Sequence, residues 1–544
     1  MPRNPFFHPR LRLALIGLLF TGALGIRVFR ITDPPMNFHR TRQYRSALIA
    51  RAYYYATSKH VPEWKKEVAT LTKQRQGTLE PPIIETIACL AYHLTGGERL
   101  WVPRLLSAVF WLVGGGFLYA LTKRLLSADA AILSTAYYLL LPYGVIASRS
   151  FQPDPMLVMA LIISLFTMVW YHDRPSTRCL IAAASTSALA ILIKPVCVFP
   201  ILGAFVSLSI WRLGVRKFLT SPAVLVFAAV SLLPGAMFYL YGILIAGFLK
   251  AQALSSFMPR LLLSTEFWIQ WLRKIEYVFG YPTVVVALLG LLALRRTYPG
   301  ALLVGLWIGY LVYGAVFTYH IHSHDYYQLQ FIPTVALSVA ALGALLFDWL
   351  TEPRLRLLCQ VAVIGEILVA GGLSIRDAHT KMTRRTHRQF VQMVEEIGEI
   401  VHHSPHTIFL SKGYGRPLQY HGELSGVNWP SRGDMLKKYR FRGRRVPAAE
   451  QRFAKMIQQT SFEYFIITSL MELQVQKDLK WFLTKNFPVH HKTERYLVFD
   501  LTRRLSVGDS SSAAGAGSRH APRAMLGQPA RAVMVNPDGT SHLD

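Results

Sequence analysis

The sequence predicts an all-α bundle of about eleven transmembrane helices, followed by a small α/β domain outside the membrane. Of the 544 residues, 52% are hydrophobic and only 16% are charged, and the mean hydropathy is +0.30. A soluble chain carries about a quarter charged residues, so this composition indicates an integral membrane protein. Apolar runs of about 20 residues, long enough to cross ~30 Å of hydrocarbon, recur as far as residue 375.

The predicted spans are these apolar runs. They lie near 11–29, 101–122, 128–147, 155–171, 178–194, 196–212, 221–246, 279–295, 299–319, 329–348 and 356–374. Only Lys194-Pro195 separates the fifth run from the sixth. The first run follows a basic start and lacks a small-x-small cleavage site, so we interpret it as an uncleaved span rather than a signal peptide.

The distribution of charge orients the predicted bundle. Lys and Arg number 59 against 30 Asp and Glu, which gives a formal net charge of +29. With residue 1 in the cytoplasm, the short inside loops, such as "TKRLLSAD" and "WRLGVRKF", are all basic, as the positive-inside rule requires. We therefore predict a multi-pass protein of the inner (cytoplasmic) membrane, with its N-terminus cytoplasmic and its C-terminal domain periplasmic or otherwise extracytoplasmic. The excess of basic residues also suits phosphate or anionic-lipid ligands, whereas no nucleic-acid motif is present.

Three regions follow one another along the chain. A transmembrane domain covers 1–375, and its first outer loop, 30–100, carries amphipathic helices. Residues 376–505 alternate amphipathic helices with short apolar strands, which predicts a soluble α/β domain. Residues 506–544 are rich in Ser, Ala and Gly and are predicted to be disordered. The four cysteines show neither a CxxC pair nor a metal-ligand spacing, so no disulfide or zinc site is predicted.

Five polar stretches stand at the ends of the predicted spans. They are "ITDPPMNFHRTRQ", "EPPIIE", "SRSFQPDP", "LIKPV" and "HIHSHDYYQL". In the predicted topology all five fall at the outer face. Ionisable residues within spans cost about 2.5–3.5 kcal/mol each on insertion scales, so their convergence on one face predicts a single site there.

Each stretch also has a plainer interpretation. Asp154 before Pro155 is a good helix-start signal, and Lys194 has a chain long enough to snorkel to the interface. The tyrosines of the fifth stretch suit an aromatic belt. The basic, aromatic segment 41–55 is also typical of a helix that lies on the membrane surface. One site at the outer face explains all of these features together.

The side chains at this face suit group transfer from a lipid phosphate. Cationic groups neutralise phosphate, and arginine does so through paired hydrogen bonds. The cationic candidates are Arg42, Arg45, Arg51, Arg149 and Lys194. Tyr53, Tyr54, Tyr326 and Tyr327 offer aromatic surfaces for a sugar ring or an isoprenoid chain. The carboxylates, which offer general bases or ligands for a divalent cation, are Asp33, Glu80, Glu85, Asp154 and Asp325.

Motifs in these stretches resemble those of a known superfamily. They are "TRQYRSALIAR", "EPPIIETIACLAYHLTGG" with "VPRLLSAV", "QPDPMLVMALIISLF", "LAILIKPV" and "HDYYQLQFIP". In this order they resemble the bacterial membrane glycosyltransferases of the protein O-mannosyltransferase superfamily (glycosyltransferase family 39-like), which includes the aminoarabinose transferases of lipid A. The resemblance covers roughly residues 10–350.

The resemblance implies the clan C fold, an active site on the outer side and an inverting mechanism. The donor would be a sugar on polyprenyl phosphate, and the acceptor a glycolipid, polysaccharide or protein. By motif, the donor-phosphate site comprises Arg42, Gln43, Arg45, Lys194, Tyr326 and Tyr327. Further residues of the site are His39, Arg51, Glu85, Arg149, His324 and Asp325. No cofactor is implied with certainty, and a divalent cation is left open because no ligand cluster requires one.

The chain departs from the superfamily pattern at the catalytic base. Relatives carry an acidic residue in or just before the first-loop helix, whereas here Arg45 occupies the place where one branch has Asp. The candidate bases are therefore, in order, Asp33, Glu80 and Asp154. Two other functions stay open: a transporter or flippase for a lipid-linked solute, and a non-catalytic binder of lipid-linked sugar.

Overall fold

The computed structural model describes residues 5–382, 386–440, 445–458 and 460–505. The chain forms two compact units. The helical unit contains the residues up to Lys59 together with Gln76–Phe390, and the sheet unit contains His60–Arg75 together with the described residues from Val391 on. The tail for which we predict disorder, 506–544, lies outside the described residues.

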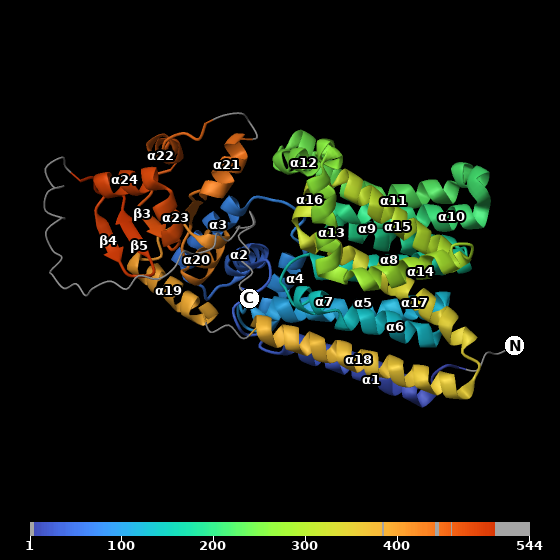
Figure 1. Ribbon diagram of the computed structural model, residues 1–544. Coiled ribbons are helices and arrows are strands. Elements are labelled where there is room, and N and C mark those ends of the chain that lie inside the picture. The colour runs from blue at the N-terminus through green and yellow to red at the C-terminus, as the bar shows by residue number, and fades with distance from the viewer. Residues whose placement is uncertain (1–4, 383–385, 441–444, 459, 506–544) are drawn as a thin grey trace. The chain divides into compact units, whose positions relative to one another are not determined.

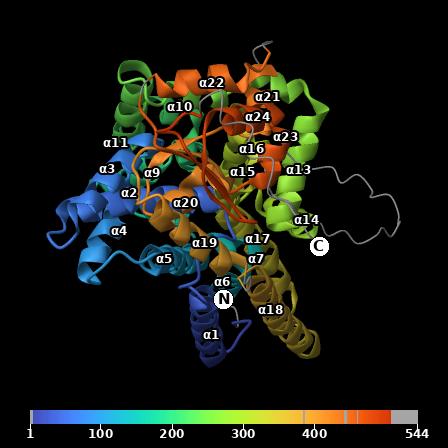
Figure 2. The ribbon, with the colours of Figure 1, turned by 90° about the vertical axis from the view of Figure 1, so that its left-hand side faces the viewer.

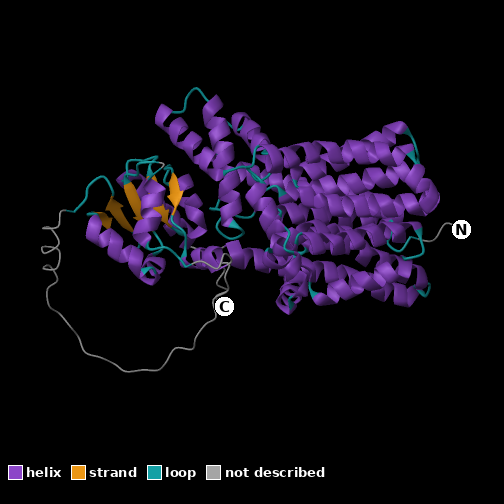
Figure 3. Ribbon diagram, turned by 90° about the horizontal axis from the view of Figure 1, so that it is seen from above, coloured by secondary structure: helices purple, strands orange, loops and turns teal. Residues whose placement is uncertain are grey.

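The helical unit is a bundle in which most of the long helices run side by side (Figures 1 and 3). Its elements are α1 (Pro9–Val28), α2 (Arg40–Thr57), α4 (Ile83–Leu94), α5 (Trp101–Leu125), α6 (Ala128–Leu140), α7 (Pro142–Ala147), α8 (Asp154–Asp173), α9 (Thr177–Ile193), η1 (Pro195–Cys197), α10 (Val198–Thr220), α11 (Pro222–Leu240), η2 (Tyr241–Ile245), α12 (Lys250–Ser256), η3 (Pro259–Leu263), α13 (Thr265–Phe279), α14 (Tyr281–Leu294), α15 (Tyr298–Val316), α16 (Thr318–Ser323), η4 (Asp325–Phe331), α17 (Ile332–Trp349) and α18 (Pro353–Met382).

Each predicted apolar run is helical in the structure. Among the described residues, eight helices are long and apolar enough to cross a membrane, or nine if α13 and α14, which meet at 90°, form one bent span. The run 128–147 is divided into α6 and α7, because Pro142 begins a new helix after the extended Leu141. The run 178–194 corresponds to α9, whose 17 residues make it shorter than the eight helices that are long enough to cross a membrane. The prediction of a multi-pass helical bundle is confirmed.

Two neighbouring spans, α10 and α15, touch through their backbones. A Cβ added to Gly305 would lie 2.2 Å from the carbonyl oxygen of Gly203, and the reverse substitution is equally close. One turn further along α15, a Cβ on Gly309 would lie 2.6 Å from the carbonyl oxygen of Phe199. Glycines four residues apart are a common device for close helix contact in membranes, where packing rather than hydrophobicity drives association.

Helix α2, which contains the basic, aromatic segment, is almost wholly enclosed. Eleven of its 18 residues are buried, including Gln43, Arg45 and Arg51. A helix lying on a membrane surface buries one stripe only, so this burial favours an internal role for α2. The helix begins after His39, whose φ of 36° and ψ of 51° place it in the left-handed region.

The sheet unit contains a five-stranded sheet in the order β2-β1-β3-β5-β4. Its strands are β1 (Thr407–Leu410), β2 (Gly426–Asn428), β3 (Tyr464–Ile467), β4 (Val489–Lys492) and β5 (Leu497–Asp500). Its helices are α3 (Glu63–Gln76), most of α19 (Thr386–Ile400), α20 (Arg416–His421), α21 (Arg432–Arg440), α22 (Ala449–Ile457), α23 (Leu470–Val475) and α24 (Lys477–Asn486). The pairings of β1 with β2 and β3 are parallel, and those of β5 with β3 and β4 are antiparallel.

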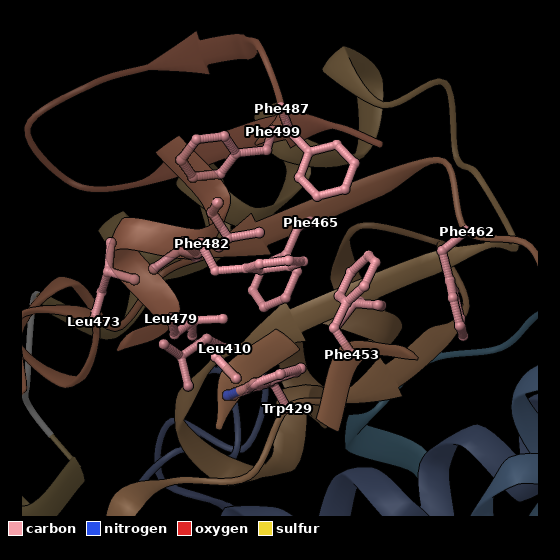
Figure 4. Packing of buried hydrophobic residues seen from close by; sticks show 14 residues of the cluster. Leu410, Trp429, Phe453, Phe462, Phe465, Leu473, Leu479, Phe482, Phe487 and Phe499 are labelled. Carbon is pink, nitrogen blue, oxygen red and sulfur yellow. The ribbon is translucent and has the colours of Figure 1, made fainter. Parts of the chain in front are cut away.

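Helices cover both faces of this sheet. α22 and α24 lie on one side, and α19 and α20 lie on the other (Figures 1 and 2). On the first side, Phe453 and Phe482 pack against Phe465 and Trp429 in an aromatic core (Figure 4). The predicted small α/β region is confirmed. The sequence pattern missed β2, which has three residues, and β4, whose "VHHK" is mostly exposed, because neither shows an apolar run.

Helix α3 belongs to the sheet unit although it lies in the first long loop of the chain. Lys65 forms an ion pair with Glu423 at 2.7 Å. Arg75 donates to the hydroxyl of Ser425 and to the carbonyl of Pro405, both at 2.8 Å. The loop 30–100, which we assigned as a whole to the transmembrane domain, therefore supplies residues to both units.

Candidate functional site

An ion pair between Lys194 and Asp154 forms the buried centre of the site. Lys194 Nζ donates to Asp154 Oδ1 at 2.8 Å, and each side chain is only 3% exposed. Pro195 disfavours helical geometry at the preceding residue, so Lys194 has extended backbone and ends α9. Asp154 opens α8, where a negative charge is favoured by the helix dipole. The other carboxylate oxygen, Asp154 Oδ2, is buried and has no hydrogen-bond partner among the described residues.

Two tyrosines of the "HDYY" turn face this lysine. Lys194 Nζ lies 4.2 Å from the ring centroid of Tyr327 and 4.9 Å from that of Tyr326. The guanidinium of Arg42 lies over the Tyr326 ring at 5.5 Å. Both tyrosines are buried on η4. A cation over an aromatic face is attracted to the ring and keeps its charge. Two positive groups, Lys194 and Arg42, therefore lie around the Tyr326 ring.

A second ion pair joins the first-loop helix to the "EPPIIE" stretch. Arg42 donates to Glu80 Oε1 at 2.8 Å. Burial by itself lowers the pKa of Arg42, but the charge of Glu80 holds that pKa well above its ordinary value. Arg45, one turn away, donates to the carbonyl of Gly77 at 2.8 Å. Both arginines are therefore anchored in the loop that precedes α4.

A third pair links the start of α2 to the "HDYY" turn. His39 Nε2 lies 2.6 Å from Asp325 Oδ1. The His39 ring also meets Tyr326 edge to face, with ring centroids 4.7 Å apart. All five polar stretches predicted from the sequence thus meet around Tyr326 and Lys194.

Gln43 has a positioning role in the structure. Its side chain donates to the carbonyl of Phe38 at 2.5 Å and accepts from the backbone N–H of Phe151 at 3.1 Å. These bonds tie α2 to the loop that carries Asp154. The amide therefore holds the site's backbone together, and its role in phosphate binding stays a prediction.

Two further predicted residues have their contacts further along α2. Glu85 accepts from the hydroxyl of Ser46 at 2.7 Å, and burial raises its pKa. Arg51 pairs with Glu98 at 3.0 Å. These contacts join α2 to α4 and to the start of α5, so they support the position of the helix.

Asp33 and Arg149 have their contacts in another group of residues. Asp33 accepts from Arg388 at 2.6 Å, and Arg149 donates to the carbonyl of Phe29 at 2.7 Å. Arg104 donates to the carbonyls of Ile31 and Asp33. This group holds the chain as it leaves α1.

His320 is a neighbour of the site that we did not predict, although its stretch was noted. Its ring stacks on that of Tyr327 with centroids 4.7 Å apart. Burial, the neighbouring His324, Lys194 and Arg42 lower its pKa to about 3. His320 is therefore neutral at physiological pH. The predicted residue His324 packs edge to face against Tyr326 at 5.5 Å.

Comparison with known proteins places this arrangement in a fold family. A family model described as dolichyl-phosphate-mannose-protein mannosyltransferase matches residues 79–239. The apo structure of ArnT from Cupriavidus metallidurans has a TM-score of 0.57 at 16% identity, covering 90% of this chain and 98% of that one. The chain has the clan C glycosyltransferase fold. The resemblance predicted from the motifs is confirmed.

Two further glycosyltransferase structures share the fold. ArnT bound to undecaprenyl phosphate has a TM-score of 0.54 at 15% identity, covering 90% of this chain and 97% of that one. Archaeal oligosaccharyltransferase AglB from Archaeoglobus fulgidus, in complex with an inhibitory peptide and a dolichol-phosphate, has a TM-score of 0.54 at 11% identity, covering 88% and 72%. No curated protein matches the chain significantly.

Within the described part of this glycosyltransferase fold, no three His, Cys, Asp or Glu side chains are grouped so that they could hold a metal ion. His322, His324 and Asp325 of the fifth polar stretch therefore do not form a ligand set there. The use of a divalent cation stays open, as it does from the sequence, and the described residues define no site for it.

The Arg42–Glu80 pair predicts how stability responds to acid. Burial by itself raises the pKa of Glu80, but Arg42, Lys194 and Arg45 hold it below its ordinary value of 4.5. Because the folded pKa is the lower one, the stabilisation is complete above the unfolded value and is lost as the pH falls through the folded value. Arg42→Ala removes the largest opposing charge, so the loss should begin at a higher pH.

At neutral pH we expect Arg42→Ala to lower the free energy of unfolding by about 3–5 kcal/mol, as breaking a buried pair does. Thermal unfolding of the detergent-purified protein between about pH 4 and pH 8 measures both effects. Lys65→Ala is the matched control, because it breaks a partly exposed pair worth about 0–1 kcal/mol. Superimposable acid profiles for wild type and Arg42→Ala would contradict the prediction.

Proposed function

We propose that the protein transfers one sugar from a polyprenyl-phosphate donor to a hydroxyl of a glycolipid, polysaccharide or protein acceptor. The transfer takes place at the outer face of the cytoplasmic membrane and inverts the anomeric centre. The observation that carries the proposal is the placement of Lys194 and Arg42 around the Tyr326 ring, beside a buried carboxylate. The solved relatives with undecaprenyl phosphate or dolichol-phosphate bound support a lipid-phosphate donor.

The two cations would hold the donor phosphate. In the resting state Glu80 and Asp154 neutralise them, and a phosphate oxygen competes with these carboxylates for the same N–H groups. The acceptor oxygen forms a bond to the anomeric carbon as the bond from that carbon to the phosphate oxygen breaks. Polyprenyl phosphate leaves with the bonding electrons, and Lys194 and Arg42 stabilise its developing charge.

The remaining polar groups would position the sugar. Asp154 Oδ2 is a buried acceptor without a partner among the described residues, so a donor-sugar hydroxyl can donate to it. Tyr326 and Tyr327 offer aromatic surface to the sugar ring or the first isoprenoid units. A base must also take the acceptor proton, and the sequence candidates are Asp33, Glu80 and Asp154.

The outer location follows from the charge of the loops. The short loops opposite the site carry the Lys and Arg excess, which favours a cytoplasmic location for them. The site is then extracytoplasmic, as is the soluble domain. Right-side-out membrane vesicles test this placement. A membrane-impermeant thiol reagent should label a Lys250→Cys variant in them, because the reagent reaches only the outer side.

The function is tested with purified protein in liposomes, radiolabelled polyprenyl-phosphate sugars and an envelope extract as acceptor source. We expect label to move from the donor to a less mobile lipid, polysaccharide or protein fraction, with polyprenyl phosphate released in equal amount. Donor binding without release of polyprenyl phosphate would favour the non-catalytic binder. Movement of intact donor between liposome leaflets without transfer would favour the flippase.

A further inference from the structure

The first-loop helix α2 carries no carboxylate, and the three carboxylates considered as bases are each occupied by a cation. Asp33 accepts from Arg388 at 2.6 Å, Glu80 from Arg42 at 2.8 Å and Asp154 from Lys194 at 2.8 Å. In each of them one carboxylate oxygen accepts a hydrogen bond from that cation, and Asp154 Oδ2, which has no partner among the described residues, is the acceptor assigned above to a donor-sugar hydroxyl. Each of these groups is thus better suited to hold a cation in place than to accept a proton from a hydroxyl.

His39 has the opposite arrangement, because its partner is an anion. Its Nε2 lies 2.6 Å from Asp325 Oδ1, and an ionised carboxylate can only accept. The proton of the neutral ring therefore resides on Nε2, which leaves a lone pair on Nδ1. A carboxylate behind an imidazole fixes the tautomer and stabilises the imidazolium that forms when the ring takes a proton.

The position of His39 brings this lone pair to the reacting groups. The ring is 4.7 Å from the Tyr326 centroid, the same ring over which Arg42 lies at 5.5 Å and Lys194 at 4.9 Å. The imidazole and both phosphate-holding cations therefore surround one side chain. A sugar phosphate bound at Tyr326 can therefore contact the two cations through its phosphate. Its anomeric face can at the same time lie beside the imidazole.

The backbone at His39 supports a functional role. His39 has φ 36° and ψ 51° and directly precedes α2. Residues other than glycine adopt this left-handed region only at an energetic cost, and such residues cluster at functional sites. The side chain is 26% exposed, whereas that of Asp325 is 16% exposed, so a substrate hydroxyl has access to the ring.

We propose that His39, oriented by Asp325, is the general base of the transfer, which makes Asp325 a positioning residue. The inference rests on the proposed function and replaces the missing first-loop acid with a histidine–aspartate pair. Nδ1 takes the acceptor hydroxyl proton as the acceptor oxygen bonds to the anomeric carbon, and polyprenyl phosphate departs. The imidazolium then returns the proton to solvent or to the phosphate.

Several charged or titratable groups face this pair and set its pH response. Asp325 lies against His39 itself, and Arg42 follows one turn along α2. From α13, Lys274 acts on Asp325 through its charge. The Tyr326 ring of η4 meets His39 edge to face, and the phenols of Tyr143 on α7 and Tyr277 on α13 interact with Asp325 directly.

The variant that tests the base is His39→Gly, because glycine suits the left-handed backbone and should preserve the fold. We expect kcat to fall about 100- to 10,000-fold, the range for removal of a general base. The KM for donor should change less than about threefold, since phosphate contacts remain. The acidic limb of the pH–kcat profile should disappear, and added imidazole should restore part of kcat.

Asp325→Asn provides an independent variant. We expect a smaller fall in kcat than for His39→Gly, because the imidazole stays in place but loses the carboxylate that fixes its tautomer and orientation. His60→Gln, at an exposed position of the sheet unit, is the matched histidine control and should leave kcat unchanged. Unfolding temperature and donor binding confirm that each variant is folded.

The outcomes separate this inference from the proposed function. If wild-type protein transfers sugar and folded His39→Gly keeps its kcat and its acidic limb, His39 is not the base, while the transferase stands. A lower kcat without imidazole rescue and with an unchanged limb would likewise overturn it. If wild-type protein binds donor but never transfers sugar, the proposed function itself fails.

Discussion

Lys194→Ala is expected to lower kcat for sugar transfer about 100- to 1,000-fold, the loss seen when one donor to a developing oxyanion is removed. Lys194 is the cation nearest to both tyrosines of the site, at 4.2 Å and 4.9 Å from their ring centroids. Lys194 and its ion-pair partner Asp154 are each only 3% exposed. The positive charge of Lys194 therefore acts on the departing phosphate in a site with little water. Initial rates with radiolabelled donor measure the effect.

This variant also leaves Asp154 as an unpaired buried charge, which should cost about 3–5 kcal/mol of stability. Lys194→Met combined with Asp154→Asn removes both charges at once and should recover most of that stability. It should not recover transfer. Arg124→Ala is the control, because its ion pair with Asp173 is about one-third exposed on both sides and far in sequence from the site. Transfer at the wild-type rate by the double variant would show that Lys194 does not act in the site.

Gly305→Leu is expected to destabilise the packing of the helical unit. A Cβ at this position would lie 2.2 Å from the carbonyl oxygen of Gly203, and a backbone atom cannot rotate away as a side chain does. α10 and α15 would have to separate, which we expect to cost about 3 kcal/mol, at the upper end of the usual range for overpacking. Yield of monodisperse protein in detergent and its unfolding temperature report the loss.

Gly116→Leu is the matched control for this substitution. Gly116 lies in the apolar helix α5, but a Cβ added there meets no atom within 4 Å. The same added volume should therefore leave yield and unfolding temperature near wild type. If both variants behave alike, the α10–α15 contact does not carry the stability assigned to it.

The sequence predicted the features of the fold that local interactions determine, and it missed features that leave no local pattern. Apolar run length and proline placement act locally, so each run was located, and Pro195 marked the break at which Lys194 lies. The division of 128–147 at Pro142 was missed, because a proline after a long apolar run is equally compatible with a kinked span. The short strands β2 and β4 were missed because they have no apolar run of their own.

The sequence predicted which types of residue form the candidate site, but it did not predict which of them pair with one another. The sequence indicated that basic, acidic and aromatic groups share one face, since every stretch lies at the same end of the predicted spans. It ranked Asp33 first as base, yet the structure places that carboxylate on Arg388. Which carboxylate meets which cation depends on packing between segments far apart in the chain, and no local pattern encodes that.

By itself the sequence determined a multi-pass helical protein with a small α/β region and one polar face, because hydropathy, charge bias and motif order are properties of short segments. Only the tertiary structure decided that α2 is enclosed, that α3 joins the sheet unit, and that His39 meets Asp325 across 286 residues. The physical reason is that ion pairs and burial depend on which helices pack together. The segment 41–55 lacks a carboxylate, and the fold brings Asp325 from η4 to His39, two residues before that segment.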